Sequence, residues 1–404
     1  MSSANANPVH ASAAPAPSLP LMHLCALLTG IGTLLLGPIL PLLAGQWHLT
    51  DARSGLLVTA QFCGSVLGGF TTFHRLRMCF AQGLWAAALG FVIFAFSPGL
   101  PLACAGLALG GFGVGRIITA NNIIAGRRHT TSPGAALARL NFSWSLGALL
   151  SPILAAWLTP RVSLRNILAS FATLFLFAAI RLFIESRNAA PELRSALDTP
   201  AIGHTFPRTL VVYFMALLCL YGGLETCFSV WLTTFAQRFG RSSLVLSDYT
   251  LVLLLAGLTA GRAAASALLP RIHERTLARI SLAVAAALAA ALASSRQPAT
   301  IAVLAVLLGF ALAPIFPAIF GNLLGYSPPA RIASVVLAVS GLGAASFPWL
   351  MGFVSTRTGS LGIALSIPAA TALVMLLLTM IGIQKPQPFE PKFPPTNGIE
   401  TEHA

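Results

Sequence analysis

Long apolar runs separated by short polar breaks dominate the pattern of residues along the chain. A helix needs about 20 mostly apolar residues to cross roughly 30 Å of hydrocarbon. The longest break, between Arg181 and Arg208, falls near the middle of the chain. The pattern predicts an all-α integral membrane protein with six spans, a polar linker and six further spans. The predicted spans are residues 20–43, 53–73, 78–96, 100–125, 134–158, 163–184, 208–236, 246–268, 276–294, 299–323, 330–354 and 361–383.

The composition agrees with this pattern and excludes a water-soluble enzyme. Apolar residues make up 56% of the 404 residues, charged residues only 8%, and the mean hydropathy is +0.83. A soluble globular protein carries about 25% charged residues to cover its surface. The six cysteines and eight histidines show no metal-ligand spacing. We therefore expect no enzymatic activity, no metal and no cofactor, and we expect the lipid bilayer to be the main partner.

The basic residues indicate how the chain is oriented. Its net charge is +14, but these residues lie in short clusters between apolar runs, which is typical of membrane topology and not of nucleic-acid binding. With the N-terminus inside, 15 Lys and Arg residues fall on inner segments and 7 on outer ones. Both termini are thus predicted to be cytoplasmic, and the Arg-rich composition favours a bacterial inner membrane.

The domain organisation follows from the same reading. We expect disordered cytoplasmic tails at residues 1–19 and 384–404, six-helix bundles at 20–184 and 208–383, and a cytoplasmic linker at 185–207. An internal repeat supports two related halves, because LGALLSP at 146–152 returns as LGAASFP at 342–348, each on the fifth span of its half. Two pseudo-symmetric six-helix bundles are typical of transporters whose site lies near the midplane between the halves.

Five stretches, one of which includes the first copy of the repeat, carry a family resemblance: GPILPLL at 37–43, LNFSWSLGALLSP at 140–152, YGGLETCFSVWLTTFA at 221–236, GLTAGR at 257–262 and GFALAPIFPAIFGN at 309–322. The chain resembles the major facilitator superfamily and, within it, the fucose permease-like branch of sugar:proton symporters. The resemblance implies the major facilitator fold and alternating access. One loop departs from the family pattern, since GFTTFHRLR at 69–77 has Phe73 where the superfamily carries Asp.

Three ionisable side chains lie at membrane depth, away from the ends of the predicted spans, where such groups are costly and mark candidate functional sites. Glu225 is the one carboxylate among them. Burial favours the neutral form of a carboxyl group, so Glu225 is the predicted proton-coupling residue; the alternative is a permanently paired anchor that closes a gate.

Arg116 and Arg262 are the two cations at membrane depth. A guanidinium keeps its charge under any plausible burial and therefore needs an anion. Arg116 is predicted to bind substrate, with helix packing as the alternative, and whether it pairs with Glu225 stays open. Arg262, within GLTAGR, is predicted to act in gating or topology.

Uncharged polar and aromatic residues within the spans complete the predicted binding site. Sugar sites combine amide and hydroxyl groups with an aromatic face. The resemblance implies that the Asn of the span 5 motif and polar residues of spans 1, 4, 7 and 10 line the cavity. An interhelical hydrogen bond is an equally good explanation for each residue alone. The candidates are Asn141, Gln61, Tyr221, Trp231, Asn121, Trp144 and Asn322.

The sequence thus predicts a monomeric secondary transporter that moves a small polar solute together with protons, with a monosaccharide as the leading substrate. An organic-anion or sugar-acid transporter that uses Arg116 is the first alternative. A proton/drug antiporter is the second, because a lone acid in an aromatic cavity serves that reaction as well.

Overall fold

A computed structural model describes residues 17–49, 51–73, 75–129, 131–187, 206–239 and 248–381, and helices fill nearly all of them. The predicted tail up to residue 16, the C-terminal tail and most of the linker lie outside these residues. The first half comprises α1 Leu19–Leu34, α2 Leu36–Gln46, α3 Asp51–Phe70, α4 Leu76–Ala95, α5 Leu100–Arg128, α6 Pro133–Leu158 and α7 Leu164–Arg187. The second comprises α8 Arg208–Phe239, α10 Thr250–Leu268, α11 Glu274–Ser294, α12 Pro298–Leu312, α13 Ile315–Leu324, α14 Ala330–Thr358, α15 Leu361–Ala364 and α16 Ser366–Met380.

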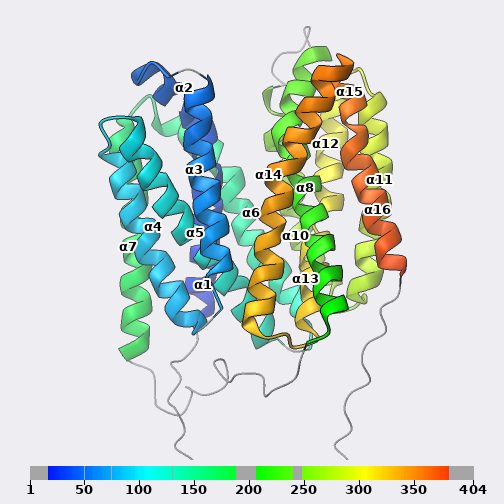
Figure 1. Ribbon diagram of the computed structural model, residues 1–404, viewed down its shortest axis with the longest axis horizontal. Helices are drawn as coiled ribbons and strands as arrows, with labels where there is room; N and C mark the ends of the chain where they lie inside the picture. The colour runs from blue at the N-terminus through cyan, green and yellow to red at the C-terminus, as the bar shows by residue number, and fades with distance from the viewer. Residues whose placement is uncertain are drawn as a thin grey trace, which may run out of the picture.

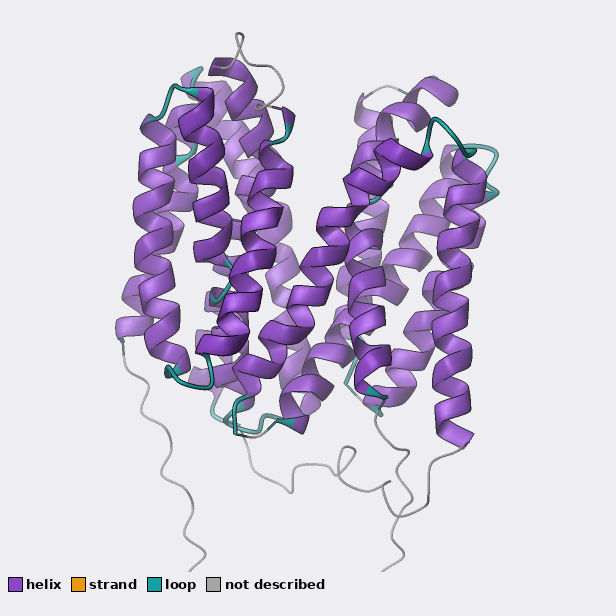
Figure 2. Cartoon of the chain, turned by 180° about the vertical axis from the view of Figure 1, so that it is seen from behind, coloured by secondary structure: helices purple, strands orange, loops and turns teal. Residues whose placement is uncertain are grey.

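The helices form two bundles that stand side by side, α1–α7 in one and α8–α16 in the other (Figure 1). We call the end where α1 begins and α16 ends the terminal side, and the opposite end the open side. The bundles meet along α6 with α10 and α3 with α14. Seen from behind, they diverge toward the open side (Figure 2). The predicted arrangement of two six-span halves is therefore what the described residues adopt.

The number of candidate spans in the described residues is close to the twelve predicted. Ten spans are long and apolar enough to cross a membrane, and the pair α1 and α2, bent by 41°, makes an eleventh. The remaining predicted span, near 53–73, forms α3, which has 20 residues but is not among the helices that are apolar enough to count as a span. The structure describes α3 packed along α5, so protein shields part of its polar surface.

Prolines explain why two predicted spans are broken. A proline cannot donate its backbone N–H to the carbonyl one turn earlier, and its ring clashes there. Span 1 breaks at Leu35, three residues before Pro38. Span 10 breaks between Leu312 and Ile315, with Pro314 inside the break and Pro317 two residues after it. The sequence predicted each of these as one continuous run.

The repeated motif has the same packing role in both halves. A Cβ atom added to Gly147 on α6 would lie 2.1 Å from the carbonyl oxygen of Leu27 on α1. A Cβ atom added to Gly343 on α14 would lie 1.8 Å from that of Cys219 on α8. Such distances mean that only glycine permits these backbones to approach so closely. The motif therefore sets the contact between the first and fifth spans of each half.

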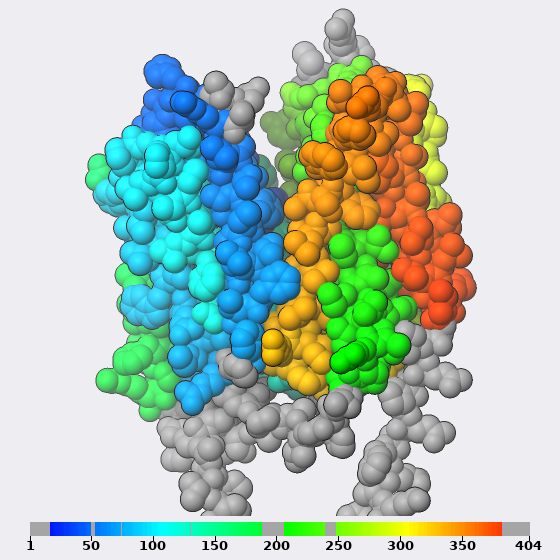
Figure 3. Space-filling view, in the orientation of Figure 1, coloured from blue at the N-terminus to red at the C-terminus, as the bar shows by residue number. Residues whose placement is uncertain are grey.

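Contacts across the two bundles close the terminal side. The Glu274 carboxylate at the start of α11 accepts a hydrogen bond of 2.9 Å from the backbone N–H of Gly134 at the start of α6. Arg127 at the end of α5 donates to the carbonyl of Pro328, ahead of α14, at 2.9 Å. Toward the open side, the surface between the halves is hollowed (Figure 3).

Large apolar side chains point outward from the bundles. Trp85 on α4, Phe183 on α7 and Trp349 on α14 are 55%, 55% and 69% exposed. Apolar surface on this scale around the outside of helices is what contact with lipid requires.

Candidate functional site

An ion pair between α8 and α10 is the centre of the candidate site. Arg262 Nη2 lies 3.3 Å from Glu225 Oε1, and the two side chains are 3% and 21% exposed. Glu225 is therefore the more accessible partner, and Arg262 is the buried one. A buried guanidinium is stable only with a counter-charge and hydrogen-bond acceptors around it, and Glu225 supplies the counter-charge.

Arg262 also reaches across the boundary to the other bundle. Its Nη1 donates to the backbone carbonyl of Asn141 on α6 at 3.3 Å. Its guanidinium lies 5.2 Å from the ring centre of Trp144, one turn further along α6, in a cation–π contact. One side chain therefore links the carboxylate of the C-terminal bundle to the backbone and an aromatic face of the N-terminal bundle. A change in the charge of Glu225 acts directly on this link.

Three polar atoms close to the pair are buried without a hydrogen-bond partner: Arg262 Nε, Trp144 Nε1 and the hydroxyl of Tyr221. Tyr221 precedes Glu225 by one turn of α8, and its hydroxyl lies close enough to Glu225 and Arg262 to interact with both through charge and hydrogen bonding, although at a geometry outside the standard limits for a hydrogen bond. Buried polar atoms are nearly always bonded in native proteins. Their clustering here therefore indicates a place where a ligand or water binds.

Arg116 lies in a different environment. Its guanidinium donates to Gln82 Oε1 at 2.9 Å, to the carbonyl of Thr71 at 3.0 Å and to Cys79 Sγ at 3.3 Å. These contacts join α5 to α4 and to the end of α3, all within the N-terminal bundle. Glu225 pairs with Arg262, which answers the question that the sequence left open for Arg116.

The predicted amide residues make interhelical contacts. Gln61 on α3 donates to the carbonyl of Gly32 on α1 at 2.8 Å, and Asn121 on α5 donates to that of Met22 at 2.9 Å. Trp231 on α8 donates from Nε1 to the carbonyl of Pro348 on α14 at 2.9 Å.

Asn141 is the predicted amide that lies beside the ion pair. Its Nδ2 donates to Asn122 Oδ1 at 3.0 Å and to the carbonyl of Leu137 at 2.8 Å. These bonds hold the α6 backbone, whose Asn141 carbonyl accepts from Arg262. Asn141 thus positions Arg262 through its main chain.

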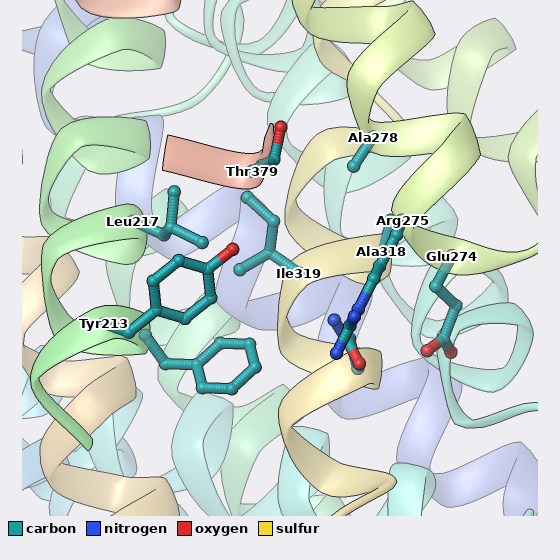
Figure 4. A pocket seen from close by; sticks show the side chains of 10 residues that line it. Tyr213, Leu217, Glu274, Arg275, Ala278, Ala318, Ile319 and Thr379 are labelled. Carbon is teal, nitrogen blue, oxygen red and sulfur yellow. The ribbon is translucent and has the colours of Figure 1, made fainter. Parts of the chain in front are cut away.

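Asn322 lines a small pocket inside the C-terminal bundle, toward the terminal side. Residues of α8, α11, α13 and α16 surround it, including Tyr213, Arg275 and Thr379 (Figure 4). The structure therefore groups Asn322 with these residues.

Sequence reasoning missed Glu274 and did not predict the partner of Arg262. Glu274 is the one acidic residue between Asp248 and Glu390, and its isolation on a basic inner surface is a signal that could have identified it. Arg262, predicted to act in gating or topology, is the partner of Glu225. Within the described ranges, no group of three His, Cys, Asp or Glu side chains could hold a metal ion.

Comparisons with known proteins agree with this architecture. A model of the Major Facilitator Superfamily matches residues 22–336. No curated protein sequence matches the chain. The E. coli fucose:proton symporter FucP superposes with a TM-score of 0.70 at 17% identity, covering 91% of this chain and 99% of FucP.

Two other solved structures show the same fold. The proton:xylose symporter XylE, bound to 6-bromo-6-deoxy-D-glucose, has a TM-score of 0.71 at 15% identity, covering 89% of this chain and 94% of XylE. The human organic anion transporter MFSD10 has a TM-score of 0.69 at 19% identity, covering 89% and 98%. At these identities the likeness concerns the fold.

Proposed function

The chain belongs to the Major Facilitator Superfamily, and on that premise we propose that it is a secondary active transporter that moves a small polar organic solute together with protons. The observation that carries the proposal is the Glu225–Arg262 pair, at 3.3 Å, where the two bundles meet. Rocking of the bundles about such a midplane site exposes it to each side of the membrane in turn.

Glu225 is suited to carry the proton because it is the more exposed partner of the pair. As a carboxylate it holds Arg262 toward α8. When Glu225 is protonated this attraction is lost, while Arg262 keeps its charge and its bond to the Asn141 carbonyl on α6. Protonation of Glu225 thus weakens the attraction of Arg262 to α8 and leaves its bond to α6, which couples protonation to the relative movement of the two bundles.

The terminal side is proposed to be cytoplasmic, as the distribution of Arg and Lys predicts, in a bacterial inner membrane. With this orientation the structure is closed to the cytoplasm through Glu274 and Gly134 and hollowed on the outer side. The protein is proposed to act as a monomer.

A monosaccharide is the leading substrate from the sequence, and two structural neighbours named as proton symporters of fucose and xylose favour it. The name of MFSD10 as an organic anion transporter favours the anionic alternative. Trp144 and Tyr221 are the proposed substrate contacts beside the ion pair. Gln61, Asn121, Trp231 and Asn322 are proposed to shape the cavity, and Arg116 is proposed to orient α3 and α4 around it.

Proton flux in proteoliposomes tests this function. The full-length protein is reconstituted with a pH-sensitive dye inside, and a panel of neutral sugars, sugar acids and lipophilic cations is added in turn. Solute-driven acidification of the interior supports symport, and alkalinisation by lipophilic cations supports the antiporter. We expect Glu225→Gln to abolish the proton signal. The exposed Asp248 of the same bundle offers the matched control Asp248→Asn, which should leave the signal intact. Persistent acidification in Glu225→Gln would refute Glu225 as the proton carrier.

A further inference from the structure

The unpartnered atoms around the ion pair are mainly donors. Arg262 Nε–H and Trp144 Nε1–H can only donate, and the Tyr221 hydroxyl can donate as well as accept. A ligand that satisfies the two N–H donors must present acceptor oxygens, to which the Tyr221 hydroxyl can also donate. A carboxylate offers two oxygens with about four acceptor sites and no donor, so it matches this set of atoms.

The charge of the site points to the same group. The pair is neutral while Glu225 is ionised. Protonation of Glu225 leaves Arg262, with a side chain 3% exposed, without a counter-charge among its contacts in the described part of the chain. A buried charge without its partner is strongly unfavourable. A neutral solute does not remove this cost, whereas a carboxylate does.

We propose that the co-transported solute is a small hydroxylated monocarboxylate, such as a sugar acid, whose carboxylate replaces Glu225 as the partner of Arg262 once Glu225 is protonated. This inference rests on the proton coupling proposed above. Trp144 Nε1 and the Tyr221 hydroxyl donate to the same carboxylate. One proton and one anion enter together, so the loaded site is neutral, as the empty site is.

Gluconate and glucose provide the two probes, because both are six-carbon polyhydroxylated molecules and only gluconate, an open chain, carries a carboxylate, whereas glucose is a neutral ring. Proton flux and membrane potential are measured with the full-length protein in proteoliposomes. Gluconate is expected to acidify the interior without generating a potential, and glucose is expected to give no proton flux. Trp144→Phe and Tyr221→Phe each remove one donor while keeping an aromatic ring. Each should raise the KM for gluconate about tenfold, the loss typical of a hydrogen bond to a charged group.

The outcomes separate this inference from the proposed function. Proton-coupled glucose flux that disappears in Glu225→Gln would overturn the inference that the substrate is a carboxylate and would leave the proposed proton symport in place. Gluconate flux without proton movement would overturn proton symport, and with it the exchange of Glu225 for the substrate. An unchanged gluconate KM in both Trp144→Phe and Tyr221→Phe would show that Trp144 Nε1 and the Tyr221 hydroxyl do not donate to the carboxylate, which also overturns the inference. Silence of the wild-type protein with both probes, in preparations that unfold in a cooperative thermal transition, also overturns the inference.

Discussion

The charge of Glu225 should stabilise the protein measurably through Arg262. Glu225→Gln keeps the size of the side chain and removes its charge. At the observed 3.3 Å between Arg262 Nη2 and Glu225 Oε1, Coulomb's law with an effective dielectric constant of about 20 gives an attraction of about 5 kcal/mol. Removing one partner of a buried pair typically costs about 3–5 kcal/mol. Arg262 keeps its bonds to α6, so we expect a loss near the lower end, about 3 kcal/mol.

Thermal unfolding of the detergent-purified protein checks this value. A unit of about 150–250 residues, the size of each bundle, loses roughly 2–4 °C per kcal/mol. Glu225→Gln should therefore lower the unfolding midpoint by about 6–12 °C. Asp248→Asn removes an exposed carboxylate that pairs with Gln237 and should change the midpoint by about 1 °C or less, because exposed polar pairs contribute little.

A double variant distinguishes the ion pair from a general packing defect. Glu225→Gln combined with Arg262→Met removes both charges, and replacing a whole buried pair by neutral groups costs far less than breaking it. We expect the double variant to be more stable than Glu225→Gln alone. A midpoint of Glu225→Gln equal to that of wild type, or effects of the two substitutions that simply add, would refute this account of the site.

Three other predictions follow from packing and from the terminal side. Gly147→Ala and Gly343→Ala should each lower the free energy of unfolding by about 1–3 kcal/mol through overpacking. Gly45→Ala is the control, because its new Cβ would have nothing within 4 Å, and it should not destabilise the protein. Equal thermal unfolding midpoints for all three variants would contradict the close helix contacts. Arg116→Gln should lower thermal stability without changing the KM of a transported solute, because its bonds join α3, α4 and α5; the reverse result would support the substrate contact predicted from sequence. Glu274→Gln should weaken a charge–dipole contact with α6 worth about 0.3–1 kcal/mol. It should therefore speed thiol labelling of Ser132→Cys at the terminal side about two- to fivefold. Unchanged labelling would show that this contact does not hold the terminal side closed.

The sequence alone was enough to predict the architecture, because lipid imposes simple rules on a chain. Runs of about 20 apolar residues predicted the spans, and the Leu-Gly-Ala repeat predicted two related halves, which Gly147 and Gly343 confirm through equivalent helix contacts. The breaks in spans 1 and 10 were less visible, because hydropathy averages over the prolines that interrupt the helical hydrogen bonds.

The partners within the candidate site were decided by the tertiary structure. The sequence identified Glu225, Arg116 and Arg262 as the costly charges and placed each within a predicted span, and so at some depth in the membrane. Depth is one coordinate, however, and it does not say which way a side chain points around its helix. The packing of α10 against α8 and α6 brings Arg262 to Glu225 and Trp144, and the packing of α5 against α4 directs Arg116 to Gln82. Both contacts depend on how helices far apart in the sequence rotate and pack together, which the spacing of residues along one helix does not encode.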